Sequence, residues 1–95
     1  MIIDKLQKYY VINGDCGEWE ERYEWKVSLS NEILCFINKK DAENYQKELQ
    51  SHADDFNMGD DSALHKLSEL DASYASHDDI QYSVQEMQIR VVSGV

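Results

Sequence analysis

The sequence has no proline, only two cysteines and four glycines, and no long hydrophobic run. Because proline is the commonest breaker of strands and helices, its absence leaves glycine and runs of Asn, Asp and Ser to mark the turns. No stretch approaches the roughly 18 consecutive apolar residues of a membrane span, and the first residues lack the basic and apolar regions of a secretory signal. These absences favour a soluble, unprocessed protein.

The two cysteines are too few for the disulfide framework of a small secreted domain. Cys16 and Cys35 also lack the Cys-x-x-Cys spacing of metal and redox motifs. We therefore expect two reduced thiols in a cytoplasmic protein. A Cys16–Cys35 disulfide stays open as the alternative, because proximity in space cannot be read from sequence.

Cations are scarce too, since nine Lys and Arg against nineteen Asp and Glu give a formal net charge of −10. Proteins bind phosphate backbones and anionic membranes through Lys and Arg, so this charge argues against direct binding of nucleic acid or membrane. A larger protein or complex with a basic surface, in particular one that normally holds nucleic acid, would instead attract this chain over long range.

What the sequence does contain is the composition of one folded domain. Its 95 residues, 42% of them hydrophobic and ten of them aromatic, are enough for a single core, and no repeat or linker divides them. The acids are spread through segments with strand and helix periodicity. We therefore place them on the surface of a single domain, residues 1–95, and not in a disordered segment.

Three strands are predicted in the first part of the chain. Residues 6–13 are rich in Tyr, Val and Ile, and residues 13–17, with two glycines, are typical of a turn. Residues 23–29 alternate strictly, so that one face carries Tyr23, Trp25, Val27 and Leu29. A tight connection at 30–32 leads to an apolar strand at 33–37, which we expect to be covered on both faces. These strands should form an antiparallel meander.

Two helices are predicted next. Asn38 can cap the first, and Asp41 suits its third position, where unpaired amides and the helix dipole favour negative charge. One apolar stripe follows at steps of three and four: Ala42, Tyr45, Leu49, His52 or Ala53, and Phe56. Residues 57–61 break this helix, and Asp60 or Asp61 can cap a shorter second one. Its apolar side would carry Leu64, Leu67, Leu70 or Asp71, and Tyr74.

A polar loop, residues 73–79, leads to a last strand that starts at Ile80. Its apolar positions change phase between Val84 and Met87, which either a β-bulge near Gln85-Glu86 or burial of both faces at one end would explain. The sequence thus predicts an α+β fold, with an antiparallel sheet of about four strands and two helices packed on one face, in the order β-β-β-α-α-β. Either the first or the third strand can neighbour the last one.

Cys16 is the candidate nucleophile, because catalytic thiols do occupy exposed turns beside a basic partner. No histidine is adjacent to it in sequence, and the neighbouring carboxylates at 15, 18, 20 and 21 oppose formation of a thiolate. An ordinary hairpin turn is the simpler interpretation. We therefore assign no catalytic residue and expect a non-enzymatic protein.

Paired aspartates are the candidate metal ligands, since calcium and magnesium prefer oxygen. The pairs are Asp54-Asp55, Asp60-Asp61 and Asp78-Asp79. Their spacing does not match a calcium-binding loop, and the three histidines, His52, His65 and His77, lack zinc-motif spacing. Helix capping and solubility explain these acids better, so neither metal nor cofactor is expected.

Aromatic residues point to a protein partner, because Trp and Tyr often anchor interfaces. Trp25 lies on an alternating apolar face and is most simply core. Trp19 lies in an acidic loop, where both an interface anchor and a loop-packing residue stay open. The candidate partner-binding residues are Asp15, Glu18, Trp19, Glu20, Glu21, Asp54 and Asp55.

The order of these segments carries a resemblance. It rests on the segments KYYVI (8–12), a glycine turn, EWKV (24–27), NKKDAENY (38–45) and YSVQE (82–86), which span most of the chain. This layout resembles small acidic proteins of phages and mobile elements, and in acidity and size the chain is similar to anti-CRISPR and other anti-defence proteins. The apolar segment 33–37 departs from the shortest versions. Since the likeness is one of character and not of aligned residues, it carries no functional residue onto this chain.

Charge without visible chemistry, together with this resemblance, implies a non-enzymatic inhibitor whose carboxylates stand where phosphates would on a basic surface of a larger protein. A toxin-neutralising immunity protein, also acidic, compact and cytoplasmic, is an alternative. A small enzyme using Cys16 and a structural or assembly component are the others.

Overall fold

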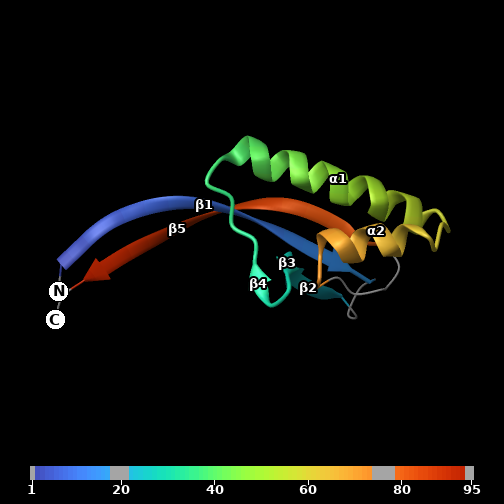
Figure 1. Ribbon diagram of the computed structural model, residues 1–95, viewed down its shortest axis with the longest axis horizontal. Coiled ribbons are helices and arrows are strands. Elements are labelled where there is room, and N and C mark those ends of the chain that lie inside the picture. Colours follow the sequence, from blue (N-terminus) through green and yellow to red (C-terminus); the bar gives the residue numbers. More distant parts are fainter. Residues whose placement is uncertain (1, 18–21, 74–78, 94–95) are drawn as a thin grey trace.

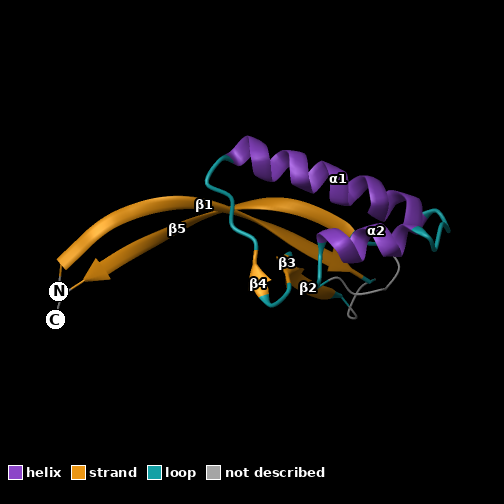
Figure 2. Ribbon diagram, in the orientation of Figure 1, coloured by secondary structure: helices purple, strands orange, loops and turns teal. Residues whose placement is uncertain are grey.

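The order of elements confirms the α+β class. The computed structural model describes residues 2–17, 22–73 and 79–93. Within them lie five strands and two helices (Figures 1 and 2): β1 (Ile2–Cys16), β2 (Tyr23–Lys26), β3 (Ser28–Leu29), β4 (Glu32–Ile33), α1 (Lys39–Asn57), α2 (Ala63–Leu70) and β5 (Gln81–Ser93). The strands form an antiparallel three-stranded sheet, in the order β2-β1-β5, and a separate small sheet of β3 and β4. The last strand therefore lies beside the first.

β1 extends beyond its predicted range, and the expected turn at 13–17 is wrong. Asn13 to Cys16 belong to the central strand, where they pair with β2 on one side and, as far as Asp15, with β5 on the other. Gly14 does not form a turn there, and what matters is that it has no side chain. A Cβ at this position would lie 2.4 Å from the Trp25 indole, so the ring occupies the room that a side chain would need.

The predicted strand at 33–37 is also wrong, and the predicted meander is divided: β1 pairs antiparallel with β2, and β3 with β4, but the two pairs belong to separate sheets. The short connection is confirmed, because Ser30 takes a positive φ of 53° and Leu29 pairs with Glu32, but β4 ends at Ile33. Phe36 then makes one isolated bridge to Tyr10 of β1. Ile33 and Ile37 are 55% and 73% exposed. The chain meets β1 only at this bridge and turns away into α1, so neither face of the segment is fully covered.

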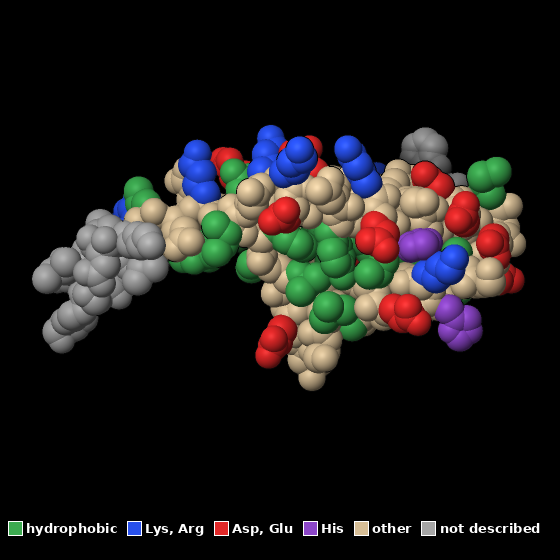
Figure 3. Space-filling model, turned by 45° about the horizontal axis from the view of Figure 1, so that its top comes forward, with side chains coloured by type: hydrophobic (Ala, Val, Ile, Leu, Met, Phe, Trp, Pro, Cys, Tyr) green, Lys and Arg blue, Asp and Glu red, His purple; other side chains and the backbone are tan. Residues whose placement is uncertain are grey.

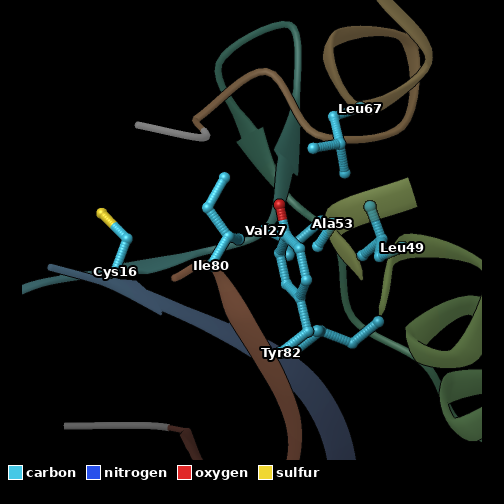
Figure 4. Close-up of a cluster of buried hydrophobic side chains, with 8 residues drawn as sticks. Cys16, Val27, Leu49, Ala53, Leu67, Ile80 and Tyr82 are labelled. Carbon is cyan, nitrogen blue, oxygen red and sulfur yellow. The ribbon is translucent and has the colours of Figure 1, made fainter. Parts of the chain in front are cut away.

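Both predicted helices form and pack on one side of the sheet (Figure 1), but the predicted cap of α2 is wrong, since its N-cap residue is Ser62, without a side-chain cap bond, and not Asp60 or Asp61. Asn38 caps α1, since its Oδ1 accepts from the Lys40 amide at 2.8 Å. The α1 stripe buries Ala42, Leu49 and Ala53, and Leu67 of α2 meets it in the core. Figure 4 shows Leu49, Ala53 and Leu67 converging with side chains from β1, from the residue that follows β2, and from the start of β5.

β5 contains no bulge at Gln85-Glu86, because its pairing with β1 runs without a shift from Gln81 to Arg90. The shift lies instead between Ile3 and Lys5 of β1. The change of phase has another cause. Ile80 and Tyr82 are buried in the core, whereas Ile89, on the other side of the strand, is 42% exposed where the ribbon leaves the helices behind.

That ribbon makes the molecule elongated. We call residues 2–9 of β1 and 87–93 of β5 the arm. They lie beyond the Phe36 bridge, after which β1 has β5 as its only β-pairing partner within the described residues. The radius of gyration is 15.6 Å, compared with about 12 Å for a compact chain of this length. Figure 1 shows the arm curving away from α1, with both termini at its tip.

A buried carboxylate connects the sheet to the helices. Asp71, which directly follows α2, is fully buried. Its Oδ2 accepts from Trp25 Nε1 at 2.7 Å and from the Tyr82 hydroxyl at 3.0 Å, and its Oδ1 accepts from the amides of Ser73 at 2.9 Å and Ser28 at 3.4 Å. Four donors from separate segments therefore satisfy one charge, as a buried charge requires.

Substituting Gly14 by alanine should destabilise the fold. The added methyl group would meet the indole of Trp25, which the Asp71 bond fixes in place. We expect the free energy of unfolding in urea to fall by about 1–3 kcal/mol, the usual range for overpacking. The double variant Gly14→Ala/Trp25→Leu should lose less than the two single losses added together, and strict additivity would contradict the steric explanation.

Substituting Asp71 by asparagine should be more costly than its size suggests. The amide NH₂ would face one of the two donor pairs, so two hydrogen bonds are replaced by donor–donor contacts. We expect a loss of about 2–3 kcal/mol in urea unfolding. Tyr82→Phe removes one donor and leaves the charge, so it should cost only about 1 kcal/mol; equal losses from the two variants would refute the network.

Candidate protein-binding site at the acidic end

The net negative charge of the chain comes from two segments of the sequence. Residues 13–31 and 49–83 contain thirteen Asp and Glu against three Lys and Arg, which accounts for the whole net charge of −10, and the remaining segments are neutral together. The C-terminal end of β1 and the connection between α1 and α2 lie at the end of the molecule away from the termini (Figure 1). Figure 3 shows many carboxylates at that end, which we call the acidic end, whereas Lys and Arg lie mainly towards the arm.

The turn between α1 and α2 forms the densest group, which we call the acidic corner: Asp54, Asp55, Asp60 and Asp61. All four are exposed. Hydrogen bonds of the Met58 amide to the Asp54 carbonyl and of the Asp60 amide to the Asp55 carbonyl close the turn. Among the described residues no Lys or Arg forms an ion pair with these carboxylates, since the one such pair is Arg22–Asp15.

Local hydrogen bonds set the conformation of the corner. The Oδ1 atom of Asp60 accepts from the hydroxyl of Ser62 at 2.5 Å and from its amide at 3.0 Å, just before α2. These two bonds hold the pKa of the Asp60 carboxyl below its ordinary value. Asp54 accepts from Gln50 Nε2 at 2.8 Å, one turn earlier in α1. Hydrogen bonds within the chain therefore set the conformation of the corner.

Most charges at the two ends of α1 oppose its dipole, and Asp41 in the first turn is the exception. Lys39 and Lys40 stand at its first positions, and the last turn contains Asp54 and Asp55 and no basic residue. The negative end of a helix dipole disfavours carboxylates by about 0.3–1 kcal/mol each when they are exposed. The dipole and the side chains thus add up to a strong negative potential at the corner.

β1 and β2 repeat this unfavourable placement. Asp15 and Glu24 are directly opposite each other across the two strands, and like charges in this position repel. Arg22 offsets one of them, with its Nη2 2.7 Å from Asp15 Oδ1. Of the predicted partner-binding residues, Asp15, Asp54 and Asp55 thus lie in acidic groups, and Glu18, Trp19, Glu20 and Glu21 lie outside the described residues.

An open hollow of about 450 Å³ lies on the sheet face that carries Asp15 and Glu24. Its polar side chains bind one another: Lys26 Nζ donates to Asn13 Oδ1 at 2.9 Å, and Asn13 Nδ2 donates to Gln85 Oε1 at 2.6 Å. Such a surface can exchange these bonds for contacts with a partner.

The remaining candidates do not come together. Cys16 is buried in the core and Cys35 is exposed, and no disulfide joins them. His52 is half-buried in α1 and His65 is exposed in α2, while His77 lies outside the described ranges. Within those ranges no three His, Cys, Asp or Glu side chains are arranged to hold a metal ion. Trp25 packs against the core, as predicted.

The sequence reasoning missed the roles of Asp60, Asp61 and Glu24 in these groups. From the sequence, the first two are candidate helix caps, and Glu24 has no assigned role. A signal existed for the corner, because four acids within eight residues of a helix end, with no Lys or Arg among them, are visible in the sequence. The pairing of Glu24 with Asp15 depends on strand register, which the sequence does not show.

Comparison with known proteins adds no relative, since no family model, curated protein or solved structure matches the chain. Neither described helix is long and apolar enough to cross a membrane.

Neutralising the end of α1 should stabilise the protein. Asp54→Asn and Asp55→Asn remove carboxylates from the negative end of the dipole, so each should raise the free energy of unfolding by about 0.3–1 kcal/mol at low salt. Asp41→Asn makes the same chemical change in the first turn and should lower it. Urea unfolding at low and high salt measures these changes in the free energy of unfolding. A change of the same sign for substitutions at both ends of α1 would contradict the dipole argument.

Proposed function

We propose that this protein is a non-enzymatic inhibitor that binds a basic, nucleic-acid-binding surface of a larger protein through its acidic end, in the manner of anti-CRISPR and other anti-defence proteins. The observation that carries the proposal is the placement of the acids: the whole net charge lies in one part of the chain, and several carboxylates stand where they cost stability.

Stability alone does not account for that placement. Asp54 and Asp55 oppose the helix dipole, and Asp15 faces Glu24 across two strands. Local rules that a protein breaks without a structural gain tend to mark functional positions. Carboxylates held at a cost to folding can recover that cost when Lys and Arg of a partner approach them.

The acidic end suits a surface that binds phosphates. The acidic corner presents four exposed carboxylates in one turn, and the Asp15–Glu24 pair adds two at the same end of the molecule. Such groups meet Arg and Lys with charge-assisted hydrogen bonds, as phosphate oxygens do. A field of one sign also speeds association with a basic partner. A toxin-neutralising immunity protein would use the same surface, and the identity of the captured partner separates the two.

A charge-removal series tests this function. Bait protein immobilised through its C-terminus is used to capture partners from an extract of the native host. The variant Asp54→Asn/Asp55→Asn/Asp61→Asn keeps the bonds from Ser62 to Asp60. The matched control Glu32→Gln/Glu43→Gln/Glu48→Gln loses as many charges from the segments that are neutral together. We expect the first to weaken binding of the captured partner by about tenfold or more, and the control to change it little.

The captured partner must also show the properties of a phosphate mimic's target. Binding should weaken steeply as salt rises, and nucleic acid should compete with the protein for the partner. Salt-independent binding, or binding that nucleic acid does not affect, would reject this function even if the partner is real.

A further inference from the structure

One edge of the main sheet is covered only in part. β5 is the edge strand in the order β2-β1-β5, and α1 protects its beginning with side-chain amides. The Tyr82 amide donates to Gln50 Oε1 at 2.7 Å, and the Tyr82 carbonyl accepts from Gln46 Nε2 at 2.8 Å. Asn57 binds both the amide of Ile80, at 2.9 Å, and its carbonyl, at 3.1 Å. At these residues α1 replaces a neighbouring strand.

This cover ends after Tyr82. In an antiparallel strand every second residue directs its N–H and C=O to the same side. The pairing with β1 is continuous from Gln81 to Arg90, so Glu86, Gln88 and Arg90 direct these groups away from β1, as Tyr82 does. Among the described residues nothing binds them on that side. A free edge without proline is a template for another strand.

The sequence along this edge is complementary to itself. If two copies of β5 pair antiparallel about a two-fold axis at Gln88, Glu86 faces the partner's Arg90, and Met87 faces the partner's Ile89. Opposite charges and apolar side chains are both favourable cross-strand pairs. An axis at Met87 would instead place Glu86 opposite a glutamine, so the charges select the first register.

We propose that this protein forms a symmetric dimer in which residues 86–90 of β5 pair with the same residues of a second copy, joining the two arms into one four-stranded sheet. The dimer is separate from the proposed inhibitor function, because it uses the edge of β5 near the arm and not the acidic end.

Two further observations fit a second copy as the occupant. The arm is a ribbon of two strands with Leu6 58% and Ile89 42% exposed, and such ribbons are marginally stable in water until more strands join them. The arm also carries little charge, since its residues 2–9 and 87–93 hold Asp4 against Lys5, Lys8 and Arg90. Antiparallel pairing about Gln88 keeps the acidic corners of the two copies apart, which limits the repulsion between two chains of charge −10.

A charge swap tests the dimer. Sedimentation velocity and light scattering of the full chain, from micromolar concentration upwards, should show twice the chain mass of 11.1 kDa. Glu86→Lys and Arg90→Glu each put two like-charged pairs across the axis and should raise the dissociation constant by about tenfold or more. The combined variant Glu86→Lys/Arg90→Glu restores opposite pairs and should dimerise about as well as the natural sequence.

Two controls sharpen the test. Gln88→Pro removes an amide that points to the free edge and not to β1, so it should abolish dimerisation while circular dichroism stays unchanged. Glu69→Lys makes the same charge change on α2 and should leave the dimer intact. A natural protein that stays monomeric at hundreds of micromolar overturns the proposal. So does a dimer that the single charge variants do not weaken or the double variant does not restore.

Discussion

The Asp71 carboxylate is the constraint on which the body of the molecule depends. It lies at the end of α2, and its four donors come from β2, β3, β5 and its own turn. A fully buried charge is tolerable only when its oxygens are satisfied, so Asp71 fixes the positions of all four segments together. The hydroxyl of Tyr45 donates to the Leu70 carbonyl beside it at 2.5 Å. Burial, and then the charges of Asp71 and Glu48, raise the pKa of Tyr45.

The row of residues beneath this carboxylate explains the shape of the sheet. Gly14 of β1 is paired with Trp25 of β2 on one side and with Tyr82 of β5 on the other. The two aromatic rings pack edge to face over the glycine, with their centroids 6.1 Å apart. Only a residue without a side chain allows both rings to reach one carboxylate. The Asp71 network therefore explains the glycine in the central strand. The glycine that suggested a turn at 13–17 is required by tertiary packing instead.

Sequence reasoning succeeded where the determining forces are local. The Asn38 cap, the α1 stripe from Ala42 to Phe56, and the break before α2 depend on neighbours within a few residues, and each was predicted. It failed for Gly14, Phe36 and Asp71, whose environments come from segments far away in sequence. Two residues of the acidic corner, Asp54 and Asp55, were predicted, because the end of a helix depends on residues close in sequence. Its companion Glu24 was not, because strand register is a tertiary property.

The distribution of charge and the uncovered edge follow from one division of the molecule. α1 binds the beginning of β5 through Gln46, Gln50 and Asn57, and its C-terminal end carries Asp54 and Asp55. The part that the helices cover therefore holds the core, the Asp71 network and the net charge. The part beyond them has no second layer and only a small positive charge, since residues 2–9 and 87–93 hold Asp4 against Lys5, Lys8 and Arg90. This ribbon is apolar in places and open at one edge, and these are the properties on which the proposed dimer rests. The acidic corner lies at the other end of the molecule, so the proposed dimer and the proposed binding of a basic partner use different surfaces.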